Sequence, residues 1–473
     1  MRIIMKFGGA SIGDSKGVSH AITIINDFAK KGDQILVVVS ALPNVTDELV
    51  NICEKAIDGD LKSITDFMER VRELHAKMAK GCIHDTRLLS EVIDELDQTS
   101  RELEEILHSV AKLMELTPRS RDFILSFGEK MSAPLICGAV KDSGLKARWF
   151  TGCEAGVTTD ENFGEAKPLM DLTIRRVKEQ LEPLLMARTI PIVAGYSACS
   201  PHGTTTTLGR GGSDYTATLL GAAIDADEVV IWKEVGGLMT ADPKIEPNAK
   251  VLERISYAEA SEMAYFGAKA IHPKALEPVS VKQIPVRIRS SNDLTTRGTL
   301  IAGEGVVRSE GVVKAVTCID KVGMISVAGA EMSGLAGIAA RVFNVLSESG
   351  INVLMISQSS SETGISFVTP RDKLRRATNV LELATLGAEY VKNVTAEDDV
   401  CVIAAVGAGM RGTPGVAARV FKAVAEKGVN VRMIAQGSSE LNISFVVPER
   451  EGPTAVRALH EEFELAKFAQ ANK

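Results

Sequence analysis

Aromatic residues and long apolar runs are scarce in this chain of 473 residues. Aromatics make up only 4% of it, with two tryptophans and five tyrosines, which disfavours an RNA-binding surface built on stacked bases. No apolar stretch approaches the ~20 residues that a membrane-spanning helix needs. The N-terminal run Met1–Lys6 reaches Phe-Gly-Gly too early for a signal peptide. We therefore expect a cytoplasmic protein.

Cysteine and histidine also lack the spacing of a metal site. None of the seven cysteines forms a Cys-x-x-Cys pair, and the seven histidines are scattered. We expect no zinc site and mostly structural, reduced thiols. The 54 basic residues are outnumbered by 61 acidic ones, for a net charge of −7. This balance argues against non-specific binding to nucleic acid or to anionic membranes.

The C-terminal third, by contrast, contains a clear internal repeat. At an offset of 78 residues, 26 of the 47 positions from Met324 to Pro370 are identical to their partners. Each copy has the order strand, glycine-rich loop, helix, strand, strand and helix, which fits a ferredoxin-like βαββαβ unit. The expected strands of the first copy are Met324–Ala328, Asn352–Ser357 and Ile365–Thr369. The pair resembles tandem ACT domains, a family of small amino-acid-binding regulatory modules.

The second copy contains a formal Gly-x-Gly-x-x-Gly at Gly407–Gly412. A dinucleotide site needs this loop in a longer βαβ framework, with an acidic residue about 20 positions further on. The first copy carries the same loop with Glu331 at the middle glycine, and only 61 residues follow Gly412. We therefore interpret the loop as part of the repeat and do not expect a hydride-transfer enzyme.

Strands and helices alternate over the first 300 residues. Short apolar runs at Ile3–Phe7, Gln34–Ser40, Ile190–Ala194 and Glu228–Trp232 are typical of buried strands. The pattern predicts a mostly parallel sheet with helices on both faces. A segment from about 49 to 116 has helical periodicity throughout and is interpreted as a helical insertion. Because such sheets bind ligands at the carboxyl ends of their strands, candidate motifs should follow each strand.

Glycine-rich and charged motifs do follow these strands. Lys6-Phe7-Gly8-Gly9 comes directly after the first strand, where exposed amides and a lysine suit phosphate oxygens. It is no P-loop, and a lysine beside a tight turn is often structural. The loop from Ser40 to Thr46 follows the second strand. It suits a small ligand, although Thr46 would serve equally as a helix cap.

The strongest local signal is the run from Thr207 to Thr216, which contains Gly-Arg-Gly-Gly-Ser-Asp and opens into a helix expected over Thr216–Ile224. Exposed amides at a helix N-terminus bind anions, and Arg210 can grip a carboxylate or phosphate with two hydrogen bonds. Ser213 or Asp214 would also suit a helix cap, but capping does not explain Gly-Arg-Gly-Gly. Glu129, in the first turn of a further helix, is ambiguous by itself.

These motifs appear in one order: Lys-Phe-Gly-Gly, Phe-Gly-Glu-x-x-Ser, Gly-Arg-Gly-Gly-Ser-Asp and Tyr-Phe-Gly-Ala-Lys-x-x-His-Pro, followed by the repeated modules. Together they resemble aspartokinase, the amino-acid-kinase-fold enzyme that phosphorylates the side chain of L-aspartate with ATP. The length fits the monofunctional form, because a fused homoserine dehydrogenase would need several hundred further residues.

The resemblance implies a role for each matching residue. Lys6 matches the catalytic lysine that bridges the ATP phosphates, and Asp214 is the second catalytic residue. Arg210 matches the arginine that grips the α-carboxylate of aspartate, and Glu129 suits its ammonium group. The implied aspartate contacts are Ser40, Thr46, Glu129, Arg210, Gly211, Gly212 and Ser213. The implied nucleotide contacts are Lys6, Phe7, Gly8, Gly9, Lys233, Glu234, Met239, Lys244, Lys269 and Ala270.

This chain departs from the commonest pattern of the family in a few places. Ala10 replaces a usual threonine, and Lys233-Glu234 stands where many members have Thr-Asp. Met239 and Lys244 replace a usual tyrosine and arginine. The reaction survives these changes, but the details of the adenine and phosphate contacts depend on them, and each lysine would equally suit a solvated surface. The cofactors implied are ATP and nucleotide-bound Mg²⁺, with no metal held by the protein alone.

The resemblance also implies a fold and a domain plan. We expect an α/β amino-acid kinase domain over residues 1–303, a linker and first ACT module over 304–395, and a second ACT module over 396–473. Glycines and alternating charges at 303–311 mark the linker.

The ACT pair implies feedback by an end-product amino acid, with threonine favoured over lysine, and a homodimer or higher oligomer formed through the modules. The candidate effector residues are Asn352, Gln358, Asn430 and Gln436. The alternative is that these polar residues recur only because the two copies have the same turns.

Two other functions stay open. One is a kinase of acetylglutamate, glutamate or a nucleotide, although such relatives generally lack the ACT pair. The other is a non-catalytic amino-acid sensor, which would be expected to have lost Lys6, Glu129, Arg210 or Asp214.

Overall fold

The computed structural model describes residues 1–268, 270–303, 311–329, 332–385 and 392–467. Its chain divides into two compact units. The first comprises Met1–Leu238, Glu253–Tyr257 and 270–303. The second comprises Met239–Leu252, 258–268 and the described residues from 311 onward. The predicted positions Lys269 and Glu331, and the predicted linker from 304 to 310, lie outside the described residues.

The first unit is built on an eight-stranded sheet in the order β3-β4-β2-β1-β7-β9-β10-β8. Neighbouring strands are parallel except for β9 and β10. The mostly parallel sheet predicted from the sequence is therefore confirmed. Its strands are β1 (Arg2–Phe7), β2 (Gln34–Val39), β3 (Ala147–Phe150), β4 (Ile190–Ala194), β7 (Glu228–Lys233), β8 (Arg254–Ser256), β9 (Val286–Ser290) and β10 (Thr299–Ala302), beside a hairpin of β5 (Ser197–Cys199) and β6 (Thr205–Thr207).

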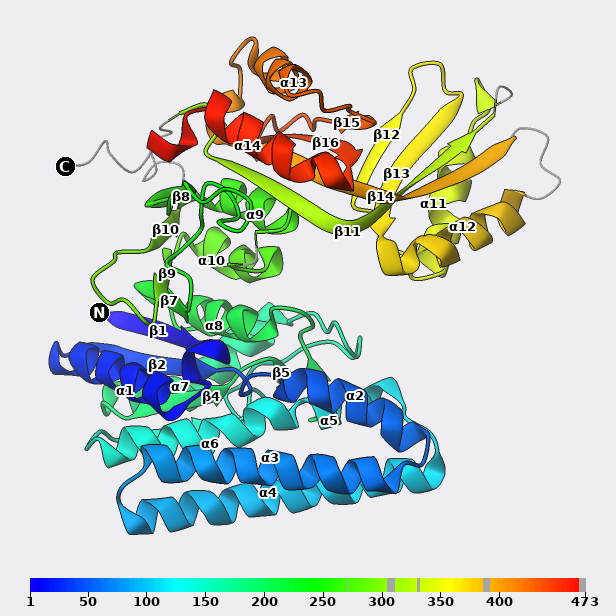
Figure 1. The fold of residues 1–473 in the computed structure, drawn as a ribbon. Coiled ribbons are helices and arrows are strands. Elements are labelled where there is room, and N and C mark those ends of the chain that lie inside the picture. Colours follow the sequence, from blue (N-terminus) through cyan, green and yellow to red (C-terminus); the bar gives the residue numbers. More distant parts are fainter. Residues whose placement is uncertain (269, 304–310, 330–331, 386–391, 468–473) are drawn as a thin grey trace. The chain divides into compact units, whose positions relative to one another are not determined.

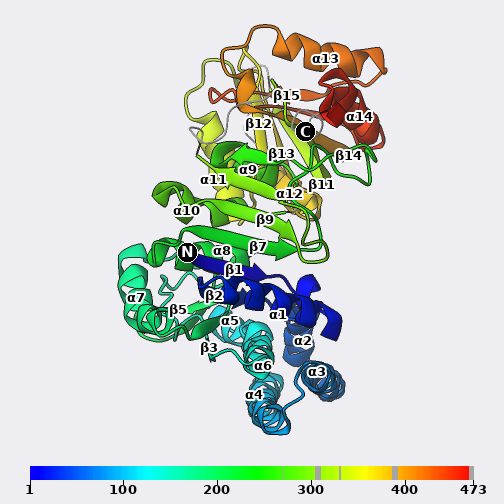
Figure 2. The same ribbon diagram turned by 90° about the vertical axis from the view of Figure 1, so that its left-hand side faces the viewer.

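Helices cover both faces of this sheet (Figures 1 and 2). One face is covered by α7 (Met170–Met186) and α8 (Gly212–Ala223), with α10 (Glu277–Lys282) against α8. The other is covered by α1 (Ser15–Lys30) and α6 (Phe127–Asp142). The strand interiors are almost wholly buried apolar residues, as expected for a parallel sheet covered twice.

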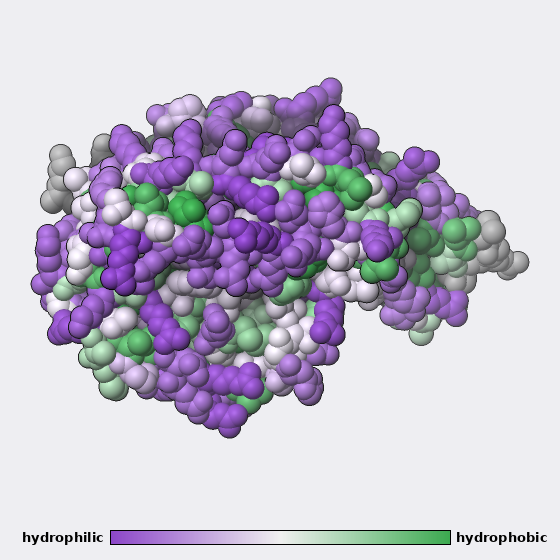
Figure 3. All heavy atoms as spheres, turned by 90° about the horizontal axis from the view of Figure 1, so that it is seen from below, coloured by the Kyte–Doolittle hydropathy of each residue, from purple (hydrophilic) through white to green (hydrophobic). Residues whose placement is uncertain are grey.

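The predicted helical insertion forms an outer layer on α6. It consists of α2 (Val45–Ile57), α3 (Leu61–Cys82) and α4 (Thr86–Leu113), of which α3 and α4 pack against each other and against α6. Asp60 and Asp85 begin α3 and α4 by accepting hydrogen bonds from amides of the first turn. The outer face of this layer is mostly hydrophilic (Figure 3), so the apolar stripe of each helix lies inward.

The sequence-based expectation that no apolar stretch approaches membrane-spanning length is wrong by length and composition alone, because the stretch Pro118–Asp142 meets both criteria. It consists of α5 (Pro118–Leu125) followed directly by α6, and 89% of its most apolar window is buried inside the protein. That burial is typical of a core helix in a globular domain.

The second unit contains the repeat as two modules of one six-stranded sheet, in the order β12-β13-β11-β14-β16-β15. The two copies match in detail: Phe343 packs edge-on to Phe367 as Phe421 does to Phe445. Glu362 accepts a hydrogen bond from the amide of Gly334, as Glu440 does from Gly412. The elements are β11 (Ala315–Ala328), α11 (Ile338–Glu348), β12 (Met355–Gln358), β13 (Gly364–Pro370), α12 (Arg371–Thr385), β14 (Asn393–Val406), α13 (Val416–Glu426), β15 (Met433–Ala435), β16 (Asn442–Pro448) and α14 (Gly452–Glu462).

The two modules exchange a strand, which the sequence did not predict. The first half of β11, Ala315–Ile319, pairs with the second half of β14 and completes the sheet of the second module. The first half of β14 likewise pairs with the second half of β11 and completes the first module. A second module that starts at 396 therefore lacks its fourth strand, which lies about 80 residues earlier in the chain.

Two segments that the sequence assigns to the kinase domain pack in the second unit: Met239–Leu252 and 258–268. Glu259, in α9 (Tyr257–Tyr265), forms a buried ion pair with Lys314 at 3.0 Å and accepts a hydrogen bond from the amide of Ala408. Thr240 is hydrogen-bonded to His460 of α14 at 3.0 Å. These buried polar contacts connect both segments to the repeated modules.

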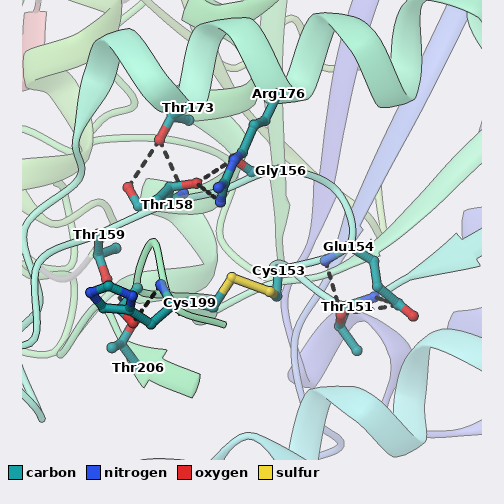
Figure 4. Close-up of a disulfide and its surroundings, with 12 residues drawn as sticks. Thr151, Cys153, Glu154, Gly156, Thr158, Thr159, Thr173, Arg176, Cys199 and Thr206 are labelled. Carbon is teal, nitrogen blue, oxygen red and sulfur yellow. Dashed lines mark hydrogen bonds between the residues drawn. A yellow bond between two sulfur atoms is a disulfide. The ribbon is translucent and has the colours of Figure 1, made fainter. Parts of the chain in front are cut away.

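The expectation of reduced thiols is wrong for one pair of cysteines. Cys153 and Cys199 form a disulfide between the loop after β3 and the end of β5 (Figure 4). The two residues lie 46 positions apart in the sequence, and no local spacing relates them. Around the bridge, the amide of Thr158 donates a hydrogen bond to the Thr173 hydroxyl, and the hydroxyl groups of Thr159 and Thr206 of β6 are hydrogen-bonded to each other. The loop is thus attached to the hairpin by the disulfide and by polar contacts.

We expect Cys199→Ser to lower the free energy of unfolding of the oxidised protein by roughly 2–4 kcal/mol, because a bridge across a long loop restricts the unfolded chain. Thermal unfolding with and without a thiol reductant measures the effect, and thiol titration counts the free cysteines. Cys82→Ser, at a free and partly exposed cysteine, is the matched control. Seven reactive thiols in the unfolded, oxidised protein would show that the bridge does not form.

Candidate active site

The carboxyl ends of β1, β2, β4 and β7 border one cavity of about 1090 Å³ in the first unit. This is the edge at which parallel sheets bind ligands. All seven substrate residues predicted from the sequence line it, together with both predicted catalytic residues. The lining residues are Lys6, Ser40, Ala41, Thr46, Asp47, Val50, Ile57, Leu116, Pro118, Arg121, Asp122, Leu125, Glu129, Phe163, Gly164, Glu165, Tyr196, Gly209, Arg210, Gly211, Gly212, Ser213, Asp214 and Lys233.

A carboxylate flanked by two ammonium groups forms part of the lining of this cavity. Asp214 Oδ1 is 2.6 Å from Lys6 Nζ, and Asp214 Oδ2 is 3.0 Å from Lys233 Nζ. The Lys6 and Asp214 side chains are 7% and 6% exposed, and that of Lys233 is 21% exposed. The lysine that departs from the common Thr-Asp pattern is thus the second partner of Asp214.

Burial and pairing act against each other in this triad. Burial alone would raise the pKa of Asp214, but Lys6 and Lys233 outweigh it and hold that pKa below its ordinary value. Burial lowers the pKa of Lys6, and the Asp214 carboxylate opposes this effect. Asp214 therefore stays ionised and orients two ammonium groups that would otherwise repel each other.

Glu129, in the first turn of α6, is a second buried carboxylate of the cavity. Its Oε1 accepts a hydrogen bond from Ser213 Oγ at 3.3 Å. Its Oε2 is buried and has no hydrogen-bond partner among the described residues. Burial raises its pKa to about 7, although the amides of Ala41 and Glu129, the Ser213 hydroxyl and Lys6 oppose the rise. A buried, unsatisfied carboxylate oxygen in a cavity is suited to a cationic ligand group.

The Gly-Arg-Gly-Gly run places amides and a guanidinium on the cavity wall. α8 begins at Gly212, four residues before the predicted start, so Ser213 and Asp214 lie in its first turn. Gly211 has a φ of 72°, a backbone conformation that favours glycine, and a Cβ there would lie 2.4 Å from His272 Cβ. Both the backbone conformation and the lack of space therefore require glycine at this position. Arg210 is exposed on the cavity lining, which leaves its guanidinium accessible to an anion.

The turns after β1 and β2 approach each other closely beside this wall. A Cβ on Gly9 would lie 2.5 Å from the carbonyl oxygen of Ala41, so this turn requires glycine. Ser40 donates its amide to the carbonyl of Phe7, which joins the two strand ends. Gly8 and Gly9 are partly exposed, and Thr46, in the first turn of α2, lines the cavity.

The structure does not gather every predicted nucleotide residue here. The Phe7 side chain is fully buried in the core and stacks on Trp232, so only its backbone is available to a ligand. Glu234 is exposed, and Ala270 is buried. Met239 and Lys244 belong to the second unit, where Lys244 is exposed.

The four candidate effector residues are all exposed in the repeated modules. Gln358 ends β12, and Gln436 directly follows β15 at the equivalent position of the other copy. The backbone carbonyl of Asn352 accepts a hydrogen bond from Thr369, and the amide of Asn430 donates to Glu451. Their side chains are accessible, and their role as effector contacts stays a prediction.

Several cavity residues were missed from the sequence. Arg121 and Asp122 lie on α5, and a single charged residue on a helix carries no local signal of a site. Tyr196 lies just after β4, and Phe163–Glu165 lies in the loop after β3. The rule that ligands bind beyond strand ends would have pointed to these last two segments.

Comparison with known families agrees with this architecture. Residues 1–290 match the amino acid kinase family, and residues 325–384 and 403–463 match an ACT domain. The chain is 33% identical over 474 residues to a bifunctional aspartokinase/homoserine dehydrogenase 1 of Zea mays, with 99% of this chain and 51% of that protein covered. It thus spans about half the length of that relative.

Other relatives match over most of both chains. Aspartokinase 2 of Arabidopsis thaliana is 32% identical over 473 residues, covering 97% of this chain and 84% of that protein. The crystal structure of E. coli aspartokinase III in complex with aspartate and ADP is 26% identical, with a TM-score of 0.83 and coverage of 98% and 100% of the two chains. Sequence and fold agree along almost the whole length, and the chain belongs to the aspartokinase family of amino acid kinases.

Proposed function

We propose that this protein uses ATP to phosphorylate the side-chain carboxylate of L-aspartate, giving 4-phospho-L-aspartate. The observation that carries the proposal is one cavity in which Lys6 and Lys233 are paired to Asp214, Glu129 Oε2 has no hydrogen-bond partner among the described residues, and Arg210 belongs to the lining. The similar E. coli aspartokinase III was crystallised with aspartate and ADP, which supports the same pair of ligands here. The 4-phosphate would enter amino-acid biosynthesis toward lysine, threonine and methionine in the cytoplasm.

The amino-acid end of the site needs one anionic and one cationic group. Glu129 Oε2 is free for the substrate ammonium among the described residues, and Arg210 offers a guanidinium to the α-carboxylate. The first-turn amides of α8 add partial positive charge on the same wall. Aspartate held by its α-groups presents its side-chain carboxylate for reaction.

The phosphate end needs charge neutralisation rather than a general base. The side-chain carboxylate of aspartate, with a pKa near ~3.9, is already ionised at neutral pH. Its oxygen attacks the γ-phosphorus, the new O–P bond forms, and the bond to the ADP oxygen breaks without any proton transfer. Lys6 and Lys233 reduce the repulsion between the anionic reactants, and the partly exposed Gly8 and Gly9 at the end of β1 would contact phosphate oxygens.

Mg²⁺ is expected to arrive bound to ATP. It usually keeps several waters and phosphate oxygens and takes only one or two carboxylates from a protein. The cavity offers carboxylates at Asp214 and Glu129, and no cluster of three or more His, Cys, Asp or Glu side chains suits a metal among the described residues. Bound Mg²⁺ would supply further neutralisation of phosphate charge.

An assay with ATP, Mg²⁺ and aspartate, coupled to ADP release, tests the proposal directly. Trapping the acyl phosphate with hydroxylamine across aspartate, glutamate and acetylglutamate separates the candidate substrates. Turnover confined to aspartate is expected. Turnover of another acidic substrate, or none at all, would refute the assignment.

We expect kcat/KM for aspartate to fall as the pH drops below about 7. The raised pKa of Glu129 means that the free enzyme protonates this group near pH 7, and a protonated acid does not pair with an ammonium group. At saturating aspartate, kcat should fall less, because the bound ammonium lowers that pKa in the complex.

The pH profile from 5.5 to 9 is measured with saturating MgATP. Glu129→Gln serves as the comparison, since it should lower kcat/KM at pH 8 and remove this step from the profile. A wild-type profile that stays flat between pH 6 and 8 would contradict the role of Glu129.

The repeated modules support feedback by an end-product amino acid, with the protein assembled as a homodimer or higher oligomer through them. Threonine is favoured over lysine because of the Gln-x-Ser-Ser-Glu pattern at Gln358 and Gln436. An E. coli aspartokinase III structure, 28% identical to this chain with a TM-score of 0.78, contains lysine and aspartate, so lysine is the comparison. Titration of each amino acid against the kinase reaction decides between them, and inhibition by neither would refute feedback.

A further inference from the structure

Asp122 is a fully buried carboxylate that the proposed chemistry does not use. It lies on α5 and is 1% exposed. Its Oδ2 accepts hydrogen bonds from the amides of Gly164 at 3.0 Å and Thr207 at 2.8 Å, and its Oδ1 accepts one from Thr207 Oγ1 at 2.9 Å. The carboxylate is therefore bonded to three donors from two distant parts of the chain.

Both of these parts line the cavity. Gly164 lies between Phe163 and Glu165 in the loop after β3, and all three are cavity residues. Thr207 ends β6, and the cavity residues Gly209–Asp214 follow it after a single intervening position. The carbonyl of Thr207 also accepts the amide of Ala166 at 2.9 Å, so loop and strand are paired on either side of Asp122.

Thr207 is also paired with Ser197 in the β5–β6 hairpin, the Leu208 side chain is buried, and two backbone hydrogen bonds hold the run that contains Arg210 before α8. Leu208 donates its amide to the carbonyl of Tyr196, and Gly212 donates to that of Gly209. Both are contacts of the backbone alone. Asp122 is the side chain that bonds Thr207 twice, through its amide and its hydroxyl. Loss of these bonds would loosen the start of the Gly-Arg-Gly-Gly run without removing Arg210 or the first-turn amides of α8.

We propose that Asp122 is a positioning residue for the amino-acid substrate: through Thr207 and Gly164 it fixes the run that presents Arg210 and the α8 amides. This inference rests on the proposed function, because the ligand it concerns is the α-carboxylate of aspartate. A residue that merely stabilised the fold would affect aspartate and ATP alike.

The test compares KM for aspartate, KM for ATP and kcat in three variants. Asp122→Ala should raise the aspartate KM about tenfold or more, with ATP KM and kcat within about threefold of wild type. Asp122→Asn should stay near wild type, because its amide oxygen can accept both N–H groups and its NH₂ can donate to Thr207 Oγ1. Thr207→Val, which keeps the amide bond to Asp122 but loses the hydroxyl and with it the contacts to Asp122 and Tyr196, should raise the aspartate KM by a smaller factor.

Tyr257→Phe is the matched control, since it removes one buried hydrogen bond, from Tyr257 Oη to the carbonyl of Ile284, at a residue outside the cavity lining. Its aspartate KM should not change. If Asp122→Ala does not fold, the aspartate KM of Thr207→Val tests the inference by itself. Given an active wild type, the inference is overturned if Asp122→Ala and Thr207→Val leave the aspartate KM unchanged, or if KM for ATP rises equally in them. An inactive wild type refutes the proposed function instead, and aspartate affinities measured by calorimetry then test Asp122 independently.

Discussion

Lys6→Ala is expected to lower kcat by about 10³-fold with only a modest change in the aspartate KM. Removing one preorganised group that stabilises developing charge typically costs 10²–10³ in kcat. Lys6 is the more deeply buried of the two ammonium groups and lies 2.6 Å from Asp214 Oδ1. Its loss would also leave Asp214 with one cation instead of two. Steady-state kinetics with both substrates varied separate the effect on kcat from that on KM.

Two further variants sharpen this prediction. Lys233→Ala should have a smaller effect on kcat, because Lys233 is more exposed and its charge is better screened by solvent. Lys30→Ala, on the exposed end of α1, should leave the kinetics unchanged. Wild-type turnover in a folded Lys6→Ala enzyme would eliminate Lys6 as the catalytic lysine.

Arg210→Ala is expected to raise the aspartate KM by about 10²-fold while kcat and the ATP KM change little. A hydrogen bond to a charged group contributes about 1.5–3 kcal/mol, and a guanidinium forms two of them with one carboxylate. Arg210 is exposed on the cavity wall, so its removal creates no buried hole and should leave the fold intact. Arg210→Lys should not restore the affinity, because an ammonium lacks the two-pronged geometry.

Arg121 is the informative control for this variant. It lies on α5, is also exposed on the lining of the cavity, and was not predicted as a site residue. We expect Arg121→Ala to change the aspartate KM far less than Arg210→Ala. The reverse order of effects would assign the α-carboxylate to Arg121 instead.

Those parts of the site that lie within single motifs were predictable. Lys6 with Gly8 and Gly9, and Arg210 with the residues up to Asp214, each form a short run at the end of a strand or just after it, where local sequence determines the backbone. The repeat was predictable for the same reason, and both copies keep a glycine at positive φ just before the helix, Gly337 and Gly415. Errors in element boundaries were small: α8 begins at Gly212, four residues before the predicted start.

Contacts between distant positions were not predictable. The pairing of Asp122 with Thr207 spans 85 residues, and that of Cys153 with Cys199 spans 46. Nothing near either partner distinguishes it from a helix-surface aspartate or a free thiol. The role of Lys233 as second partner of Asp214 is of the same kind, since it depends on the distance between β7 and α8.

The sequence by itself determined the classes of element, the duplicated module and the motifs at strand ends, because hydrophobic period and glycine-dependent turns are local properties. Only the tertiary structure decided which distant segments complete each other. The first half of β11 completes the second module, and Met239–Leu252 packs with the modules rather than with the sheet that precedes it in sequence. Strand edges and buried polar groups must find partners, and the partner that satisfies them is selected by packing in three dimensions.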